Sequence, residues 1–298
     1  MTPTLERITI YPVKSLDGVA CDDARVLPGG ALEHDRRWRL VDNDGLVVHA
    51  KRTPLVHAIR AGFEVEDGRW LVSLEADERA IRAGAIPGVE RLVGLRPAAF
   101  PLVPGREGPC GWLGEALGLD LLLQERVEGG FPDDREAAGP TLVAVATLVE
   151  VARWFAFGID EARRRFRVNL EVGGCPMFWE DALASPARAE PGPSLLDLPR
   201  DVAADPFAGL PPPEPLAFAV GTARFRATNV CRRCPVPSRD SRTGAVAALF
   251  REAFEARRSH GLRPDVDVTG WGHYYRLAIN TTGLGAGEVR VGDGVTVG

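Results

Sequence analysis

The chain has 298 residues, of which 45% are hydrophobic and 26% are charged, and this composition is typical of an ordinary globular protein. Disordered, collagen-like and fibrous classes are therefore excluded. The net charge of −5 argues against nucleic-acid binding, because phosphate binding depends on clustered positive charge. We expect no DNA or RNA partner.

The first residues, MTPTLERITI, lack the basic and apolar segments of a secretion signal, and no segment offers about 18 uninterrupted apolar residues. We therefore expect a cytoplasmic protein with no membrane partner. The cysteines are odd in number and mostly scattered, which does not favour a disulfide framework. They are Cys21, Cys110, Cys175, Cys231 and Cys234.

The first third of the chain has the pattern of β-strands. Residues 43–45 (NDG) separate two β-rich runs, and Asp67 with Gly68 separates two further runs in which apolar and polar residues alternate. Such dipeptides favour hairpin turns, since Gly adopts positive φ without strain. This region is predicted to be an antiparallel sheet or barrel.

The middle of the chain adds helices. Residues 110–119 have helical spacing and reach Gly118, and the polar residues 128–139 suggest an exposed connection that follows a domain boundary near residue 125. Residues 141–145 predict a strand that runs into a helix. At the start of that helix, Thr147 and Glu150 are spaced as in a capping box.

The last third contains a proline-rich run at residues 185–216, which we interpret as a surface insertion. A helix is predicted over residues 245–260, and the tail returns to strands separated by glycines. The predicted fold class is therefore α+β and mostly β.

The sharpest local motif is CRRC, in which Arg232 and Arg233 lie between Cys231 and Cys234. Structural zinc, a redox dithiol and two inert core cysteines are all compatible with the spacing, although zinc lacks further ligand pairs and the dithiol lacks a helix after it. Neighbouring arginines favour a thiolate, which is the form that ligates soft metals. They also supply fork-shaped donors for phosphate.

Several motifs occur together in one order along the chain. They are YPVKSLDGV (11–19), HDRRWRLVDNDG (34–45), HAKRTP (49–54), RFRVNLEV (165–172), WEDAL (179–183), CRRC with RDSRTG (231–244), and VRVGDGV (289–295). In these motifs the sequence resembles the MOSC domain proteins, of which the mitochondrial amidoxime reducing component is the characterised type. The resemblance implies an N-terminal β-barrel domain over 1–125, packed on a β-barrel MOSC domain over 126–298 with a few peripheral helices.

The resemblance further implies a molybdenum cofactor, a pterin-bound molybdenum, with Cys234 as its one protein ligand and catalytic residue. Cys231 has no role by this matching. A phosphomonoester with nearly two negative charges requires several basic or hydroxyl donors, and a pterin edge requires directional hydrogen bonds. The positions that match the family's cofactor-binding residues are Lys14, Ser15, Arg36, Thr147, Arg167, Asn169, Arg232 and Arg233.

Simpler interpretations of these residues stay open. Lys14 could be a surface turn residue, Arg36 and Arg167 could be solvated strand residues, and Thr147 could be only the helix cap. At Arg232 the family often has serine, and the proline-rich run is longer than the family suggests.

The function that the resemblance implies is a molybdenum-dependent oxidoreductase that removes oxygen from N-hydroxylated or N-oxide small molecules. Because the sequence has no flavin, haem or iron–sulfur motif, electrons would come from an external ferredoxin- or cytochrome-type carrier with its reductase. One alternative is a carrier of the molybdenum cofactor or of sulfur that uses Cys234. The other is a non-catalytic β-domain protein.

Overall fold

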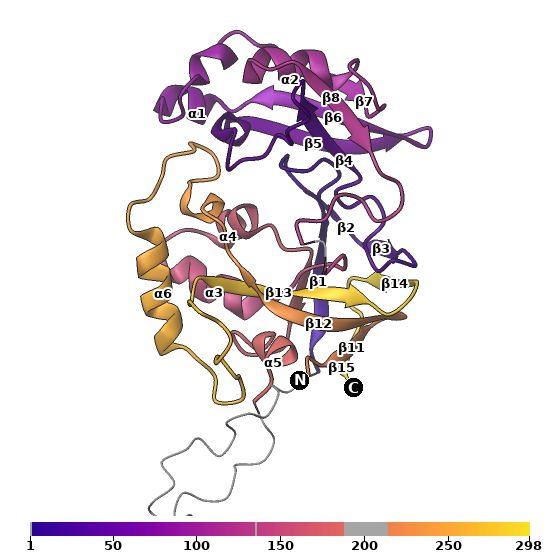
Figure 1. The fold of residues 1–298 in the computed structure, drawn as a ribbon, viewed down its shortest axis with the longest axis vertical. Coiled ribbons are helices and arrows are strands. Elements are labelled where there is room, and N and C mark those ends of the chain that lie inside the picture. The colour runs from indigo at the N-terminus through magenta and orange to yellow at the C-terminus, as the bar shows by residue number, and fades with distance from the viewer. Residues whose placement is uncertain (1, 135, 188–213) are drawn as a thin grey trace, which may run out of the picture.

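The computed structural model describes residues 2–134, 136–187 and 214–298 (Figure 1). Most of the predicted proline-rich insertion, residues 188–213, lies outside the described residues. Within the described part of the chain, no helix is long and apolar enough to cross a membrane.

The largest sheet has eight strands in the order β15-β11-β12-β13-β9-β10-β1-β2. Its strands pair antiparallel except β9 and β10, which are parallel. The strands are β1 (Thr4–Ile10), β2 (Val19–Cys21), β9 (Leu142–Ala144), β10 (Leu170–Gly173), β11 (Ala217–Val220), β12 (Ala223–Arg232), β13 (Arg276–Gly283) and β15 (Val295–Val297).

Three smaller sheets complete the β-structure. The first pairs β3 (Asp23–Val26) with β14 (Gly287–Arg290), and the second pairs β4 (Trp38–Asp42) with β8 (Leu121–Glu125). The third contains β5 (Ile59–Glu66), β6 (Arg69–Ala76) and β7 (Ala98–Pro101).

Six α-helices and three short 3₁₀ helices lie in the described residues. The α-helices are α1 (Glu78–Ala83), α2 (Pro109–Leu117), α3 (Val145–Trp154), α4 (Ile159–Phe166), α5 (Asp181–Ala184) and α6 (Phe250–His260). The 3₁₀ helices are η1 (Pro54–Ala58), η2 (Val89–Leu92) and η3 (Val236–Ser238). Figure 1 shows β4 to β8 with α1 and α2 at one end, and the large sheet with α3 to α6 at the other.

The mostly β fold with a few helices confirms the predicted class, but the described residues form no closed barrel. A barrel requires an unbroken ring of strand pairing. In the described residues, the large sheet instead ends at β2 and β15, and the strands β4 to β8 divide into two sheets with no ladder between them.

The local predictions succeed where one turn or one helix face decides the structure. Asp67 and Gly68 form the β5–β6 turn with φ of 48° and 75°, the positive values that this hairpin turn requires. Helix α2 ends at Gly118, as the spacing predicts. The turn at 43–45 also forms, but the residues after it contribute a single bridge between Val41 and Val47 rather than a strand.

Helix α6 begins five residues later than predicted. Val246 bridges Arg239 in an extended conformation, and Leu249 has a left-handed φ of 57°. Both features are incompatible with a right-handed helix before Phe250. The α-helical periodicity of the sequence therefore extends beyond the helix itself.

The hydrophobic core has more than one centre. One cluster, containing Trp38 and Leu113, joins β4 to β8 with α1 and α2. A second, containing Ile8 and Phe225, follows the large sheet, and a third fills the space between α3, α4 and α6. Since β1 and β2 belong to the large sheet, the amino-terminal residues pack with the carboxyl-terminal half; the division at residue 125 stays a prediction.

Candidate functional site

A cavity of about 1080 Å³ is lined by segments from both halves of the chain. Ten Lys and Arg residues and six Asp and Glu residues line it, although the chain as a whole carries a net charge of −5. Positive charge is thus concentrated at this cavity. It brings together eight of the predicted site residues, namely Lys14, Ser15, Arg36, Arg167, Asn169, Arg232, Arg233 and Cys234.

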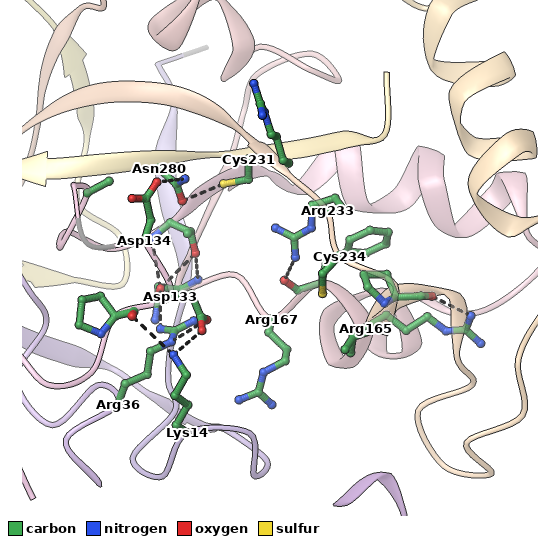
Figure 2. Close-up of a pocket in the computed structure, with 18 of the residues that line it drawn as sticks. Lys14, Arg36, Asp133, Asp134, Arg165, Arg167, Cys231, Arg233, Cys234 and Asn280 are labelled. Carbon is green, nitrogen blue, oxygen red and sulfur yellow. Dashed lines mark hydrogen bonds and ion pairs between the residues drawn. The ribbon is translucent and has the colours of Figure 1, made fainter. Parts of the chain in front are cut away.

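Lys14 and Arg36 are held by the chain that follows β1. The backbone N–H of Lys14 donates to the Trp38 carbonyl over 2.8 Å, and the backbone N–H of Arg36 donates to the Tyr11 carbonyl over 2.8 Å. Ser15 and Arg36 both have left-handed backbones, with φ of 75° and 50°. These two tight bends direct the Lys14 and Arg36 side chains to the same part of the cavity (Figure 2).

The ring of Tyr11 supports two of the cavity's guanidinium groups. Arg36 lies 5.3 Å and Arg167 lies 4.1 Å from the ring centroid, within the range of cation–π attraction. Burial raises the pKa of Tyr11 to about 12, so the ring is a neutral phenol. Its hydroxyl donates to the Val168 carbonyl over 3.4 Å.

Arg167 carries a positive charge that the protein does not neutralise. It follows α4 with φ of 53°, and its guanidinium donates to the Leu16 carbonyl over 2.6 Å. No carboxylate of the described residues forms an ion pair with it. Burial and the charge of Arg36 lower the pKa of Arg167, which means that an anion bound beside it would be stabilised.

Asn169 lies in the cavity wall, but its side chain is already engaged. Its amide donates to the Thr9 carbonyl over 3.0 Å and to Asp35 Oδ1 over 3.1 Å. Its oxygen accepts from Thr141 and, at 3.4 Å, from Arg36. Since both amide hydrogens have partners, Asn169 positions Asp35 and Arg36 in this structure.

The two cysteines of CRRC have different surroundings. Cys231, near the end of β12, is 4% exposed, and its thiol donates to Asn280 Oδ1 over 3.0 Å. Burial raises the pKa of Cys231 to about 11, although Arg233 opposes the shift. Cys234 is a free, half-buried cysteine that lines the cavity (Figure 2).

Arg233 turns back from the CRRC motif toward α4. Its guanidinium donates to the carbonyls of Phe166 and Leu277 and lies 5.4 Å from the Phe166 ring centroid. Like Arg167, it forms no ion pair with a described carboxylate. Arg232 is exposed at the end of β12, and no described group neutralises it either.

The described residues contain no cluster of three or more His, Cys, Asp or Glu side chains that could hold a metal ion. A zinc site made only of protein ligands therefore finds no support in this part of the chain. A half-buried thiol beside unpaired guanidinium groups fits a different ligand set, in which one thiolate holds a soft metal whose remaining ligands come from an anionic cofactor.

Comparison with known proteins assigns the amino-terminal part of the chain to a family. Residues 2–87 match the family described as the MOSC N-terminal beta barrel domain. The chain carries a MOSC N-terminal domain. The resemblance predicted from the sequence is thereby confirmed.

The chain is also similar to curated proteins named molybdenum cofactor sulfurase. It is 26% identical over 196 residues to the one from Drosophila yakuba, and 26% identical over 200 residues to the one from Drosophila melanogaster. Each match covers 60% of this chain and 24% of the relative. The chain thus spans about a quarter of the length of these relatives.

Among solved structures, the YuaD protein from Bacillus subtilis matches with a TM-score of 0.38 and 11% identity. The match covers 100% of this chain and 96% of that one. A likeness of this size supports no inference about function.

Thr147 is the predicted site residue that the fold does not bring to the cavity. It is fully buried in α3, where its hydroxyl donates to Glu180 Oε2 over 3.1 Å and accepts from the Phe178 N–H over 2.6 Å. The predicted capping box is wrong, because Ala144 is the N-cap and Glu150 binds Arg153 instead.

Asp133 and His57 also line the cavity, although no sequence motif assigns them a role. Asp133 belongs to the polar stretch that we interpreted only as a connection, and its pair with Asp134 was the available signal. Burial, with the charges of Arg239 and Arg60, lowers the pKa of His57 to about 4. His57 is therefore a neutral imidazole at pH 7.

Proposed function

We propose that this protein binds a molybdenum cofactor in the cavity through Cys234 and reduces N-hydroxylated or N-oxide compounds. The observation that carries the proposal is the meeting of one accessible thiol with cationic groups from distant parts of the chain, Lys14, Arg36, Arg167 and Arg233. The MOSC N-terminal domain and the relatives named molybdenum cofactor sulfurase support the choice of cofactor.

Each residue has a distinct part in this proposal. Cys234 supplies a thiolate to the metal. Arg167 and Arg233, whose charges have no carboxylate partner, join Lys14 and Arg36 in binding the phosphate. Asn169 and the Tyr11 ring hold Arg36 in position. When bound, the cofactor supplies the two-electron chemistry of oxygen removal.

The reaction needs two electrons and two protons for each oxygen atom, which leaves as water while the N–O bond breaks. The chain's sequence contains no motif for a second redox centre, so a one-electron carrier of ferredoxin or cytochrome type would supply the electrons. The cavity of about 1080 Å³ slightly exceeds the upper range of roughly 300 to 1,000 Å³ for small-molecule sites. That leaves space for a small substrate beside the cofactor.

The names of the relatives favour a second candidate, in which Cys234 carries the cofactor or sulfur for delivery to another protein. The accessible thiol suits this role as well, so the geometry does not separate the two proposals. They differ in whether the protein turns over substrate repeatedly. A carrier releases its load once, whereas a reductase turns over repeatedly.

An assay of oxygen removal separates the candidates. Protein purified from a host that makes molybdenum cofactor is given benzamidoxime with reduced viologen as an artificial donor. We expect repeated turnover, lost in Cys234→Ser and kept in Cys231→Ser, and no turnover with reduced nicotinamide alone.

Molybdenum-loaded protein that never turns over would contradict the reductase and favour the carrier. Rapid turnover with reduced nicotinamide alone would reveal a flavin or nicotinamide site in the chain.

A further inference from the structure

An acidic segment of the chain lies across one part of the cavity. Residues 131–134, of sequence FPDD, follow β8 and are called here the acidic strap. Figure 2 shows Asp133 facing Lys14 and Arg36, while Asp134 lies toward Asn280. The strap thus reaches from the amino-terminal residues to β13.

The strap satisfies the whole hydrogen-bonding capacity of Lys14. The Lys14 ammonium donates to the Phe131 carbonyl over 3.2 Å and to the Pro132 carbonyl over 3.5 Å, and its Nζ lies 2.5 Å from Asp133 Oδ1. An ammonium has three donors. Lys14 therefore has none left for a ligand in this arrangement.

Asp133 also pairs with Arg36, whose guanidinium is bound by Asp35 as well. Its Oδ2 lies 3.3 Å from Arg36 Nε. Desolvation in the cavity opposes ionisation, but Arg36 and Lys14 hold the pKa of Asp133 well below its usual range. The strap thus places a carboxylate between two cations, whereas Arg167 and Arg233 have none.

The ends of the strap are fixed more firmly than Asp133 itself. The backbone N–H of Phe131 donates to the Arg36 carbonyl over 2.8 Å, and Asp134 Oδ2 accepts from Asn280 Nδ2 over 3.1 Å. The Asp133 side chain is 69% exposed, against 18% for Lys14 and 11% for Arg36. Its carboxylate can therefore rotate into solvent without breaking a core contact.

We propose that Asp133 is an internal counter-ion that occupies the Lys14–Arg36 pair until an anionic ligand displaces it. Phosphate, free or as part of a cofactor, competes with this carboxylate for the same donors. Asp133 thereby sets the affinity of the cavity for anions. The identity of the natural ligand rests on the function proposed above. The competition between Asp133 and phosphate does not depend on that function.

Binding of inorganic phosphate to the cofactor-free protein tests the competition. An exposed ion pair contributes up to about 1 kcal/mol. Phosphate can bind only to the molecules in which Asp133 has left Lys14, so the apparent affinity for phosphate is reduced to that fraction of its intrinsic value. Asp133→Asn should thus bind phosphate about fivefold more tightly than the unmodified protein, as measured by calorimetry.

Asp134→Asn is the matched control, because it removes the same charge from the neighbouring residue but leaves the Lys14 contact in place. It should bind phosphate within about twofold of the unmodified protein. Equal tightening in both variants would show a general charge effect and overturn the proposal.

A second readout needs no ligand. Lys14 and Lys51 are the only lysines of the chain, and Lys51 is exposed, so amine acetylation followed by peptide mass spectrometry has an internal reference. Asp133→Asn and Asp133→Ala should raise the ratio of Lys14 to Lys51 labelling severalfold, and Asp134→Asn should not.

An unchanged labelling ratio in both Asp133 variants would overturn the proposal even if no phosphate binding were measurable. A failure of the proposed function would look different. Protein without molybdenum or turnover, but with the expected labelling, would leave the strap intact and remove only the cofactor assignment.

Discussion

Cys231 and Cys234 are three residues apart, yet the fold gives them unlike chemistry. The Cys231 thiol is buried and donates to Asn280, and burial raises its pKa to about 11. The Cys234 thiol opens into a cavity lined by guanidinium groups. Cys231 also lines the cavity, but its thiol is buried and bound to Asn280, so Cys234 is the more accessible of the two.

Alkylation rates test this difference in the cofactor-free protein. At pH 8, a thiol with a pKa of about 11 is only about 0.1% thiolate, and the thiolate is the reactive form. Iodoacetamide should therefore modify Cys234 at least about tenfold faster than Cys231, as measured by peptide mass spectrometry. Equal rates would show that Cys231 is accessible and ionisable.

Glu180 is a buried carboxyl away from the cavity that makes stability depend on pH. One of its oxygens accepts from the Thr147 hydroxyl and the Ala144 N–H, while the other has no partner among the described residues. Burial raises the pKa of Glu180 from 4.5 to about 7. The folded state therefore holds this proton more tightly than the unfolded state.

Because the folded pKa is the higher one, the free energy of unfolding should fall as pH rises from about 4.5 to about 7. The loss amounts to at most about 3 kcal/mol. Glu180→Gln, which cannot ionise, should show a flatter profile in urea unfolding measured across this range. Parallel profiles for the two proteins would mean that Glu180 has no raised pKa.

At the scale of elements, two consecutive glycines shape the entry to the acidic strap. Gly129 and Gly130 have φ of 78° and 59°, which side chains rarely adopt. A Cβ at Gly130 would lie 2.4 Å from the Asp35 carbonyl oxygen, whereas a Cβ at Gly129 would meet nothing within 4 Å. Only Gly130 combines the bend with a close backbone approach.

The two alanine variants therefore separate strain from crowding. Gly129→Ala should cost about 1 kcal/mol from its positive φ alone, and Gly130→Ala should cost about 2 to 4 kcal/mol because the strap must also move. Urea unfolding measures both. Equal losses would show that the strap is not packed against residues 35 and 36.

The elements that the sequence predicts are those with a local cause. The β5–β6 turn follows from Asp67 and Gly68, and α2 follows from its apolar spacing and Gly118. Sheet closure has no local cause, since Ile8 pairs with Leu170 across the middle of the chain. The barrels are therefore expected only from the resemblance, and among the described residues the pairing of distant strands gives open sheets.

At the site, too, features with a local sequence signal are predicted and features set by distant contacts are not. Most cofactor-binding candidates were found through family motifs, and the fold brings them to one cavity without testing their roles. Asp133 belongs to no family motif, and its partner Lys14 is far away in sequence. The distance is that of the Lys14 bond to the neighbouring Phe131 carbonyl, which spans 117 residues. Thr147 fails for the opposite reason, since its partners lie on the buried side of α3.

At the scale of the whole molecule, the cavity depends on both halves of the chain. Lys14 and Arg36 come from the first 40 residues, and Arg167 and Cys234 come from the second half. Strand β1 lies within the large sheet between β10 and β2. The halves are therefore joined by a shared sheet as well as by a shared site.

Expression of residues 126–298 alone tests this interdependence. The fragment lacks Leu5 and Ile8, which are at most 1% exposed in the core of the large sheet, and it leaves β10 as an unpaired edge. We expect no cooperative thermal transition from the fragment by circular dichroism. A cooperative transition would show that the carboxyl-terminal half is an independent domain.

The molybdenum content of the purified protein tests the assignment of Cys234 most directly. Protein from a host that makes molybdenum cofactor should contain about one molybdenum per chain in the unmodified and Cys231→Ser forms, and almost none in Cys234→Ser, because a hydroxyl does not replace a thiolate on a soft metal. Mass spectrometry of the metal in the three proteins gives the answer. Equal loss from both cysteine variants, or the same content in all three, would contradict a site built on Cys234.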